Sequence, residues 1–209
     1  MFIALEGIDG SGKSTQIDFI VHWLETHGVA SKNILVTREP THDGEYGIHI
    51  RKVLSGEEAM SVSPLEFQEL FVRDRKEHLE KVILPRLHNQ DSVVVCDRYF
   101  LSTLAYGHAR GDGVAHEDLI ALHEKILGMS WVIPDITLYI DVSAETAMAR
   151  LEQRNKGKTL EYFETKKEFL EKAREAYKDC AKQFSNVFII DGEKSVEEVS
   201  QAIKSILTS

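Results

Sequence analysis

A glycine-rich run near the start of the chain has the residue types and spacing of a phosphate site. Residues 7–14, Gly-Ile-Asp-Gly-Ser-Gly-Lys-Ser, fit the pattern G-x-x-x-x-G-K-[ST]. The glycines let successive N–H groups point at phosphate oxygens, and a following helix adds its positive end. We expect Lys13 to reach the β- and γ-phosphates and Ser14 to hold Mg²⁺. The predicted ATP-binding residues are Gly7, Ile8, Asp9, Gly10, Ser11, Gly12, Lys13, Ser14 and Thr15.

Two arginines that each follow a predicted strand could hold a second phosphate. These are Arg38 and Arg98. Guanidinium groups bind phosphate through paired hydrogen bonds, and the ends of parallel strands are where ligands bind. The alternative is a pair of surface arginines, matched with Glu39 and Asp97. We favour phosphate binding, which adds a site for an anionic acceptor beside the ATP site.

Two acids accompany these cations. Asp97 ends a predicted strand, where it could hold a magnesium-bound water or orient the acceptor, or cap the next helix. Asp9 lies inside the phosphate run, and a carboxylate there repels phosphate. It must therefore face magnesium, a water or a sugar hydroxyl.

Phe67, Phe71, Arg75 and His78 recur at helical spacing and share one face. Phe71 could stack on a base and Arg75 could donate to its edge. Alternatively both phenylalanines are core and residues 73–75 form a solvated charge run. We assign Phe67 to the core and leave Phe71 open.

Strand and helix patterns alternate along the chain. Strands are predicted at 2–6, 34–37, 92–96, 136–140 and 187–190, and a turn-rich stretch at 40–47. Helices are predicted near 15–27, 64–87, 114–127, 144–154, 166–183 and 195–207. The alternation predicts an α/β fold, a three-layer P-loop sandwich with a five-stranded parallel sheet and helices on both faces. Its carboxyl edge would gather the phosphate run, Arg38 and Arg98.

Composition excludes several classes. The 209 residues carry net charge −9, which argues against a broad nucleic-acid surface, and 43% are hydrophobic, as in a globular protein of one domain over 1–209. No apolar run is long enough to span a membrane, and the first residues are expected to form a strand rather than a signal peptide. Cys96 and Cys180 match no zinc spacing. We expect a reduced, cytoplasmic location.

The sequence lacks the signatures of other P-loop classes. The nearest match to the guanine-reading N-K-x-D is Asn-Lys-Gly-Lys at 155–158, and the only D-x-x-G lies at 9–12. A transporter-type L-S-G-G is absent. A kinase remains, with a nucleotide-binding switch protein as the rival from another class.

Over nearly its whole length the sequence resembles the thymidylate kinase family. The resemblance rests on the phosphate run and on five further segments, with Arg150 and Arg154 downstream. They are Thr-Arg-Glu-Pro at 37–40, Leu-Phe-Val-Arg-Asp-Arg at 70–75, Asp-Arg-Tyr at 97–99, Ser-Thr-Leu-Ala-Tyr at 102–106 and Asp-Val at 141–142. The resemblance implies phosphoryl transfer from ATP-Mg²⁺ to thymidine monophosphate (dTMP) in dTTP synthesis, nucleotides as partners and a homodimer. A kinase for another deoxynucleotide or nucleoside is the nearest alternative.

The family also implies roles for single residues. Arg38 and Arg98 would grip the acceptor phosphate, Phe71 would stack on thymine, and Arg75 would donate to its O4. Asp9 would meet the 3′-hydroxyl or the phosphate network. Tyr106 would lie near the 2′ position and disfavour ribonucleotides. A cis peptide is expected before Pro40.

Two departures from the family pattern stand out. Gly107-His108 follow Ala105-Tyr106 where the family places a base-reading glutamine, so His108 or a backbone group must compensate, or selectivity is relaxed. Residues 41–47 replace a glycine-rich turn.

The phosphate run contains no arginine, and Gly10 occupies the relevant region. In the family that this sequence resembles, the arginine that stabilises the transferring phosphoryl group comes either from the phosphate run or from a lid, so the resemblance implies that a lid at about 150–162 supplies it. Arg154 is the first choice, ahead of Lys156 and Lys158. The alternative is a solvated helix end.

Overall fold

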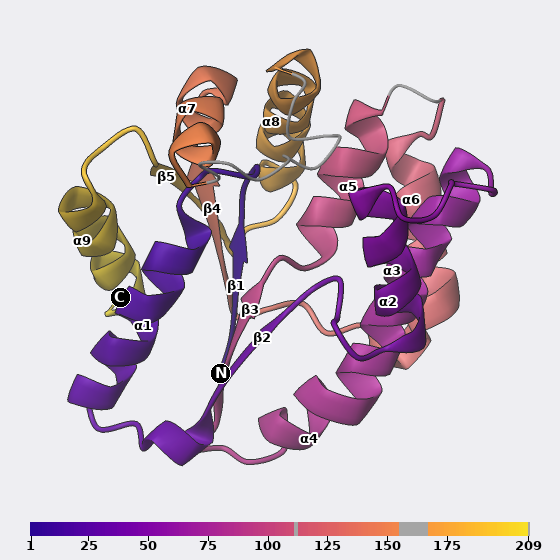
Figure 1. Cartoon of the computed structure of the whole chain (residues 1–209). Coiled ribbons are helices and arrows are strands. Elements are labelled where there is room, and N and C mark those ends of the chain that lie inside the picture. The colour runs from indigo at the N-terminus through magenta and orange to yellow at the C-terminus, as the bar shows by residue number, and fades with distance from the viewer. Residues whose placement is uncertain (111–112, 155–166, 209) are drawn as a thin grey trace.

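The computed structural model describes residues 1–110, 113–154 and 167–208 (Figure 1). One sheet of five parallel strands has the order β2-β3-β1-β4-β5. The strands are β1 (Phe2–Glu6), β2 (Ile34–Arg38), β3 (Val93–Asp97), β4 (Ile136–Asp141) and β5 (Val187–Asp191). All five agree with the sequence prediction to within one residue at either end. The first strand is central because it is buried throughout and pairs with both β3 and β4.

Helices cover both faces of this sheet. They are α1 (Lys13–Thr26), α2 (Glu45–Ser55), α3 (Pro64–His78), α4 (Leu84–Leu87), α5 (Phe100–Ala109), α6 (His116–Leu127), α7 (Ala144–Arg154), α8 (Lys167–Ala181) and α9 (Val196–Leu207). A π-helical segment, η2 (Leu79–Ile83), joins α3 to α4, and the turns η1 (Ser31–Asn33) and η3 (Gly128–Ser130) are 3₁₀. The predicted helix over 64–87 is therefore one helical run with a π segment.

Alternation along β1 divides the core in two. Ile3 and Leu5 face α1 and α9, and these helices flank one side of the sheet in Figure 1. Phe2 and Ala4 face the other layer, which contains α3, α5, α6 and α8. The three-layer α/β prediction is confirmed.

Two helices were not predicted. Residues 45–55 form α2, although the sequence predicts a turn-rich stretch at 40–47. The second, α5, is buried on almost every side, so it lacks the polar stripe that marks a surface helix. In the described residues, no helix has the length and apolar character needed to cross a membrane.

Strand register brings the predicted site together. Asp97 pairs with both Leu5 and Arg38, so the ends of β1, β2 and β3 are neighbours. The loops that follow them converge on one edge, as the sequence predicts for a parallel sheet.

Candidate active site

The loop after β1 forms one wall of a cleft of about 750 Å³. The backbone has a positive φ at Gly7, Gly10 and Gly12, and residues with a side chain rarely adopt such angles. A Cβ on Gly10 would lie 2.4 Å from the carbonyl oxygen of Ala147 in α7, so no side chain fits there. The start of α1 points into this cleft, which Lys13, Ser14 and Thr15 line. The loop therefore has the geometry of a phosphate cradle.

Lys13 is folded onto the loop itself. Its Nζ donates to the carbonyl oxygens of Gly7 (3.0 Å) and Ile8 (3.2 Å). Burial, together with the positive charge of Arg98, lowers the pKa of Lys13 to about 8. An incoming triphosphate adds negative charge beside this ammonium group, which bonds carbonyl oxygens in the ligand-free protein.

A second cation, Arg98, lies largely buried beside the cradle. Arg98 Nη2 donates to Asp9 Oδ1 at 2.6 Å and its Nη1 to the Gly7 carbonyl at 2.9 Å. The Tyr106 hydroxyl donates to Asp9 Oδ2 at 3.3 Å, and its ring lies 5.1 Å from the Arg98 guanidinium. Burial opposes ionisation of Asp9, but Arg98 and Lys13 outweigh it and lower its pKa to about 2. Asp9 therefore faces Arg98, a partner that the sequence reasoning did not consider.

Arg98 is held by groups that the sequence reasoning missed. Its Nη1 also donates to Tyr177 Oη (3.1 Å) and Ser102 Oγ (3.2 Å). Both hydroxyls donate to Glu6 Oε2, and Glu6 Oε1 accepts from the backbone N–H groups of Tyr99 and Ser102. Burial raises the pKa of Glu6. Glu6 thus binds the N-terminal end of α5. The alternative that Asp97 caps the helix after its strand is therefore wrong, because Glu6 accepts from the first N–H groups of α5 instead.

Asp97 and Arg38 meet at the cleft. Arg38 Nη2 donates to Asp97 Oδ2 at 2.7 Å, and the arginine side chain is 48% exposed. Burial opposes ionisation of Asp97, but Lys13, Arg98 and Arg38 lower its pKa. Its Oδ1 is buried and has no hydrogen-bond partner among the described residues. With the exposed Ser14 hydroxyl on the same cleft, this orphan oxygen is a donor set that suits Mg²⁺ and its waters.

A second cavity, of about 110 Å³, adjoins the cleft and is lined by Phe71, Arg75 and Tyr106. Phe67 also borders it but is 1% exposed, and it packs edge-on against Phe71 with ring centroids 5.3 Å apart. The assignment of Phe67 to the core is therefore confirmed, and Phe71 is left with a face toward the cavity.

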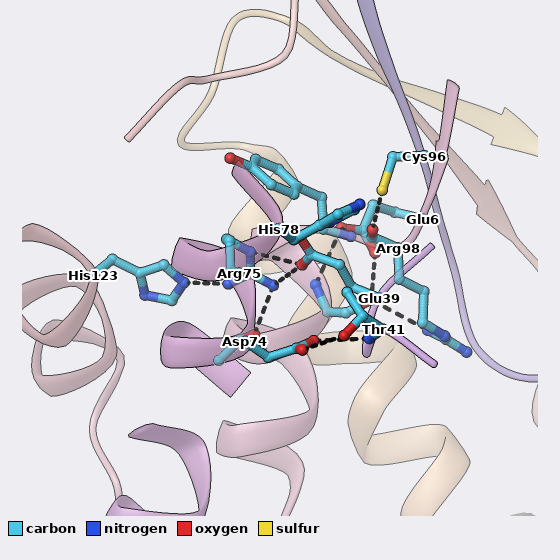
Figure 2. Close-up of polar contacts among 12 residues, drawn as sticks. Glu6, Glu39, Thr41, Asp74, Arg75, His78, Cys96, Arg98 and His123 are labelled. Carbon is cyan, nitrogen blue, oxygen red and sulfur yellow. Dashed lines mark hydrogen bonds and ion pairs between the residues drawn. The ribbon is translucent and has the colours of Figure 1, made fainter. Parts of the chain in front are cut away.

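Arg75 is fully buried rather than part of a solvated charge run, so that alternative is wrong. Its Nε and Nη2 pair with Glu39 Oε2 at 2.8 and 2.7 Å, Nη2 reaches Thr103 Oγ1 at 3.2 Å, and Nη1 donates to His123 Nε2 at 2.7 Å (Figure 2). His123 Nδ1 then donates to the Leu119 carbonyl oxygen. Burial is the larger cause, and the positive charge of Arg75 the smaller one, that lowers the pKa of His123 to about 3. The guanidinium is locked in one orientation.

Glu39, His78 and Cys96 lie behind Arg75, with ligand-type atoms within 4.8 Å of one another. The Glu39 carboxylate is already bound to Arg75 and, through Oε1, to His78 Nδ1 at 3.0 Å. Burial raises the pKa of Cys96 well above its usual value, so the thiol stays protonated. These groups support Arg75 rather than a metal. The peptide between Glu39 and Pro40 is cis, as predicted.

The unusual stretch 41–47 is anchored to α3. Thr41 donates to Asp74 from its backbone N–H (2.8 Å) and its hydroxyl (2.5 Å), as Figure 2 shows. A Cβ on Gly47 would lie within 3 Å of both residues, so glycine is needed for close packing. His108 is exposed and does not line the base cavity, so it does not replace a base-reading side chain.

The arginines of α7 also reach the cleft. Arg150 donates to the carbonyl oxygens of Ser11 (3.3 Å) and Gly192 (3.0 Å). Arg154 is exposed one turn further along. The predicted lid candidates Lys156 and Lys158, and the rest of the lid from 155 on, lie outside the described residues.

A phosphate cradle beside a second pocket, at the carboxyl edge of a parallel sheet, defines a P-loop phosphotransferase. The family model described as thymidylate kinase matches residues 5–203. The chain belongs to the thymidylate kinase family.

Curated relatives of similar length carry the same description. The chain is 39% identical to the thymidylate kinase of Thermosipho africanus, with 99% of this chain and 97% of that protein covered. It is 34% identical to the probable thymidylate kinase of Pyrococcus horikoshii, covering 99% and 95%. Among solved structures, thymidylate kinase from Ehrlichia chaffeensis matches with TM-score 0.74, 28% identity and coverage of 99% and 98%.

Proposed function

We propose that the protein transfers the γ-phosphoryl group of ATP to dTMP, which gives thymidine diphosphate on the route to dTTP. The observation that carries this proposal is that Asp9 and Arg98 line both the phosphate cleft and the base cavity. An acceptor whose base enters the cavity therefore presents its phosphate to the cradle. Family membership supports thymine as that base.

The ATP phosphates bind the loop from Gly7 to Thr15, with Lys13 released from its carbonyl partners to the β- and γ-oxygens. Ser14 and, through water, Asp97 hold Mg²⁺. When bound, the ion neutralises charge on the β- and γ-phosphate oxygens. Asp97 Oδ1 supports this assignment because it is buried and has no partner in the part of the chain that the structure describes.

The acceptor phosphate binds Arg38 and Arg98, and Asp9 meets the sugar or the phosphate network. Phe71 stacks on thymine, Arg75 donates to O4, and Tyr106 lies beside the 2′ carbon. A phosphate oxygen then attacks the γ-phosphorus in line, and no general base is needed because a phosphate dianion is already nucleophilic. Catalysis consists of positioning and charge stabilisation.

Arg154 stabilises the transferring phosphoryl group in this scheme. A side chain at position 10 is sterically excluded by α7, so the phosphate loop cannot supply this charge from there. In related phosphoryl transfers such a cation contributes about 10³–10⁵ in rate.

A coupled assay with dTMP, dUMP, dGMP and thymidine tests the substrate. We expect the highest kcat/KM with dTMP, and we expect Lys13→Ala and Arg98→Ala each to abolish turnover while the fold persists. Near-normal turnover in either variant sinks the assignment. Preference for thymidine would indicate a nucleoside kinase, and ATP binding without transfer a switch protein.

The remaining features of the proposal concern assembly and setting. We infer one catalytic domain over 1–209 with its lid at about 150–162, working in the cytoplasm as a homodimer without nucleic-acid partners. Membership of the family supports the homodimer. Sedimentation equilibrium at micromolar concentration tests the dimer, and a monomer contradicts it.

A further inference from the structure

One polar side chain in the base cavity has no role in the scheme above. Gln68 lies on α3, one turn before Phe71 and two turns before Arg75, and all three line the cavity. It is only 3% exposed. Within the described residues, no hydrogen bond joins its amide to another group.

The Gln68 amide lies at the cavity and is not sealed off by protein atoms. Buried polar side chains are almost always hydrogen-bonded, because leaving one unpaired costs stability. On the same helix, Asp74 is bonded to Thr41, and Arg75 and His78 are bonded to Glu39. Gln68 differs from them, and the cavity it faces is where a partner would enter.

The chain makes room for Gln68 by having glycine opposite it. A Cβ on Gly107 of α5 would lie 3.3 Å from Gln68 Cδ, 3.4 Å from its Cγ and 2.9 Å from Leu119 Cδ1. These distances are tighter than normal carbon contacts. Glycine at 107 therefore lets the Gln68 stem lie against α5.

Thymine presents a carbonyl, an N–H and a second carbonyl along one edge. Arg75 can serve only the carbonyls, because arginine has donors and no acceptor. Most of its donors are already used by Glu39, Thr103 and His123. The Glu39 carboxylate is itself bound to Arg75 and His78. The N3–H group needs an acceptor; the Thr103 hydroxyl oxygen already accepts from Arg75, whereas in the described residues no hydrogen bond is made by the Gln68 amide oxygen.

We propose that Gln68 reads the N3 edge of the acceptor base: its Oε1 accepts from N3–H while its Nε2 donates to an adjacent carbonyl. The inference rests on the proposed dTMP kinase activity. Gln68 and Arg75, both on α3, then define the base together, with the amide at N3 and the guanidinium at O4. The amide that is unpartnered in the ligand-free protein gains both of its bonds from the substrate.

N3-methyl-dTMP provides the test, because the methyl group removes the N3–H and adds bulk at that atom. We expect wild-type kcat/KM for dTMP to exceed that for N3-methyl-dTMP by at least about 10-fold. In Gln68→Met, kcat/KM for dTMP should fall roughly 10- to 100-fold through KM. The preference for dTMP should shrink to within about 3-fold, with kcat and the KM for ATP little changed.

Gln201→Met, the same change at an exposed position of α9, is the matched control and should behave as wild type. If Gln68 had a purely structural role, Gln68→Met would lower kcat/KM equally for dTMP and for N3-methyl-dTMP. An unchanged preference for dTMP in Gln68→Met therefore overturns the inference. Wild type that uses both substrates equally well overturns it without any variant. Wild type that is inactive on dTMP overturns the proposed function, and this inference with it.

Discussion

Lys13 predicts an unusual pH dependence for ATP binding. Its ammonium group is buried beside Arg98, and its pKa in the ligand-free protein is lowered to about 8. With that pKa, the protonated fraction is about 0.9 at pH 7 and about 0.1 at pH 9. Bound phosphates favour the charged form, so binding takes up a proton and weakens as the pH rises. ATP affinity should therefore fall about tenfold between pH 7 and pH 9.

Calorimetric titration with a non-hydrolysable ATP analogue and Mg²⁺ measures this affinity at pH 7, 8 and 9. Repeating the pH 8 titration in buffers of different ionisation enthalpy counts the protons taken up. Lys13→Arg is the control, because guanidinium stays protonated over this range and its affinity should not depend on pH. A dissociation constant that changes less than about twofold in wild type, or no proton uptake at pH 8, refutes the reasoning.

Three further outcomes follow from the packing around the site. Glu39→Ala leaves the Arg75 guanidinium buried and unpaired, so urea unfolding should show a loss of about 3–5 kcal/mol; a loss below about 1 kcal/mol contradicts this. Phe71→Ala should raise the KM for dTMP roughly 10- to 100-fold with little change in stability, whereas the buried Phe67→Ala should lose about 3–5 kcal/mol. Equal losses in melting temperature would be evidence against that division. The Cys96 thiol is buried with a raised pKa, so it should react with a thiol reagent only as fast as the protein unfolds; rapid labelling of native protein would show otherwise.

The sheet and the phosphate loop could be predicted from sequence because both depend on local patterns. Five short apolar runs mark the strands, and the P-loop spacing places one loop at a strand end. Parallel pairing then brings Arg38 and Arg98 to the same edge. These inferences need only the period of the side chains and the direction of the strands.

What could not be predicted depends on contacts between distant segments. The sequence predicts Gly47 to be a turn residue, but it lies in α2, where a side chain would collide with Thr41 and Asp74. Helix α5 has no polar face, so its period is hidden. Glu6 was read only as the end of a strand, yet it binds the start of α5. No spacing in the sequence indicates these pairings.

The central place of β1 has a consequence for synthesis on the ribosome. Its partners are β3 and β4, so the first strand to emerge cannot complete its pairing until residue 141 has been added. At about 5–20 residues per second, this takes roughly 7 to 27 s after Glu6 is made. Until residue 97 has been added, Phe-Ile-Ala-Leu has no native neighbour on either side, and until residue 141 has been added it still lacks its neighbour on the β4 side. The P-loop is thus encoded first and assembled late, and the nascent chain must keep this apolar strand from pairing elsewhere.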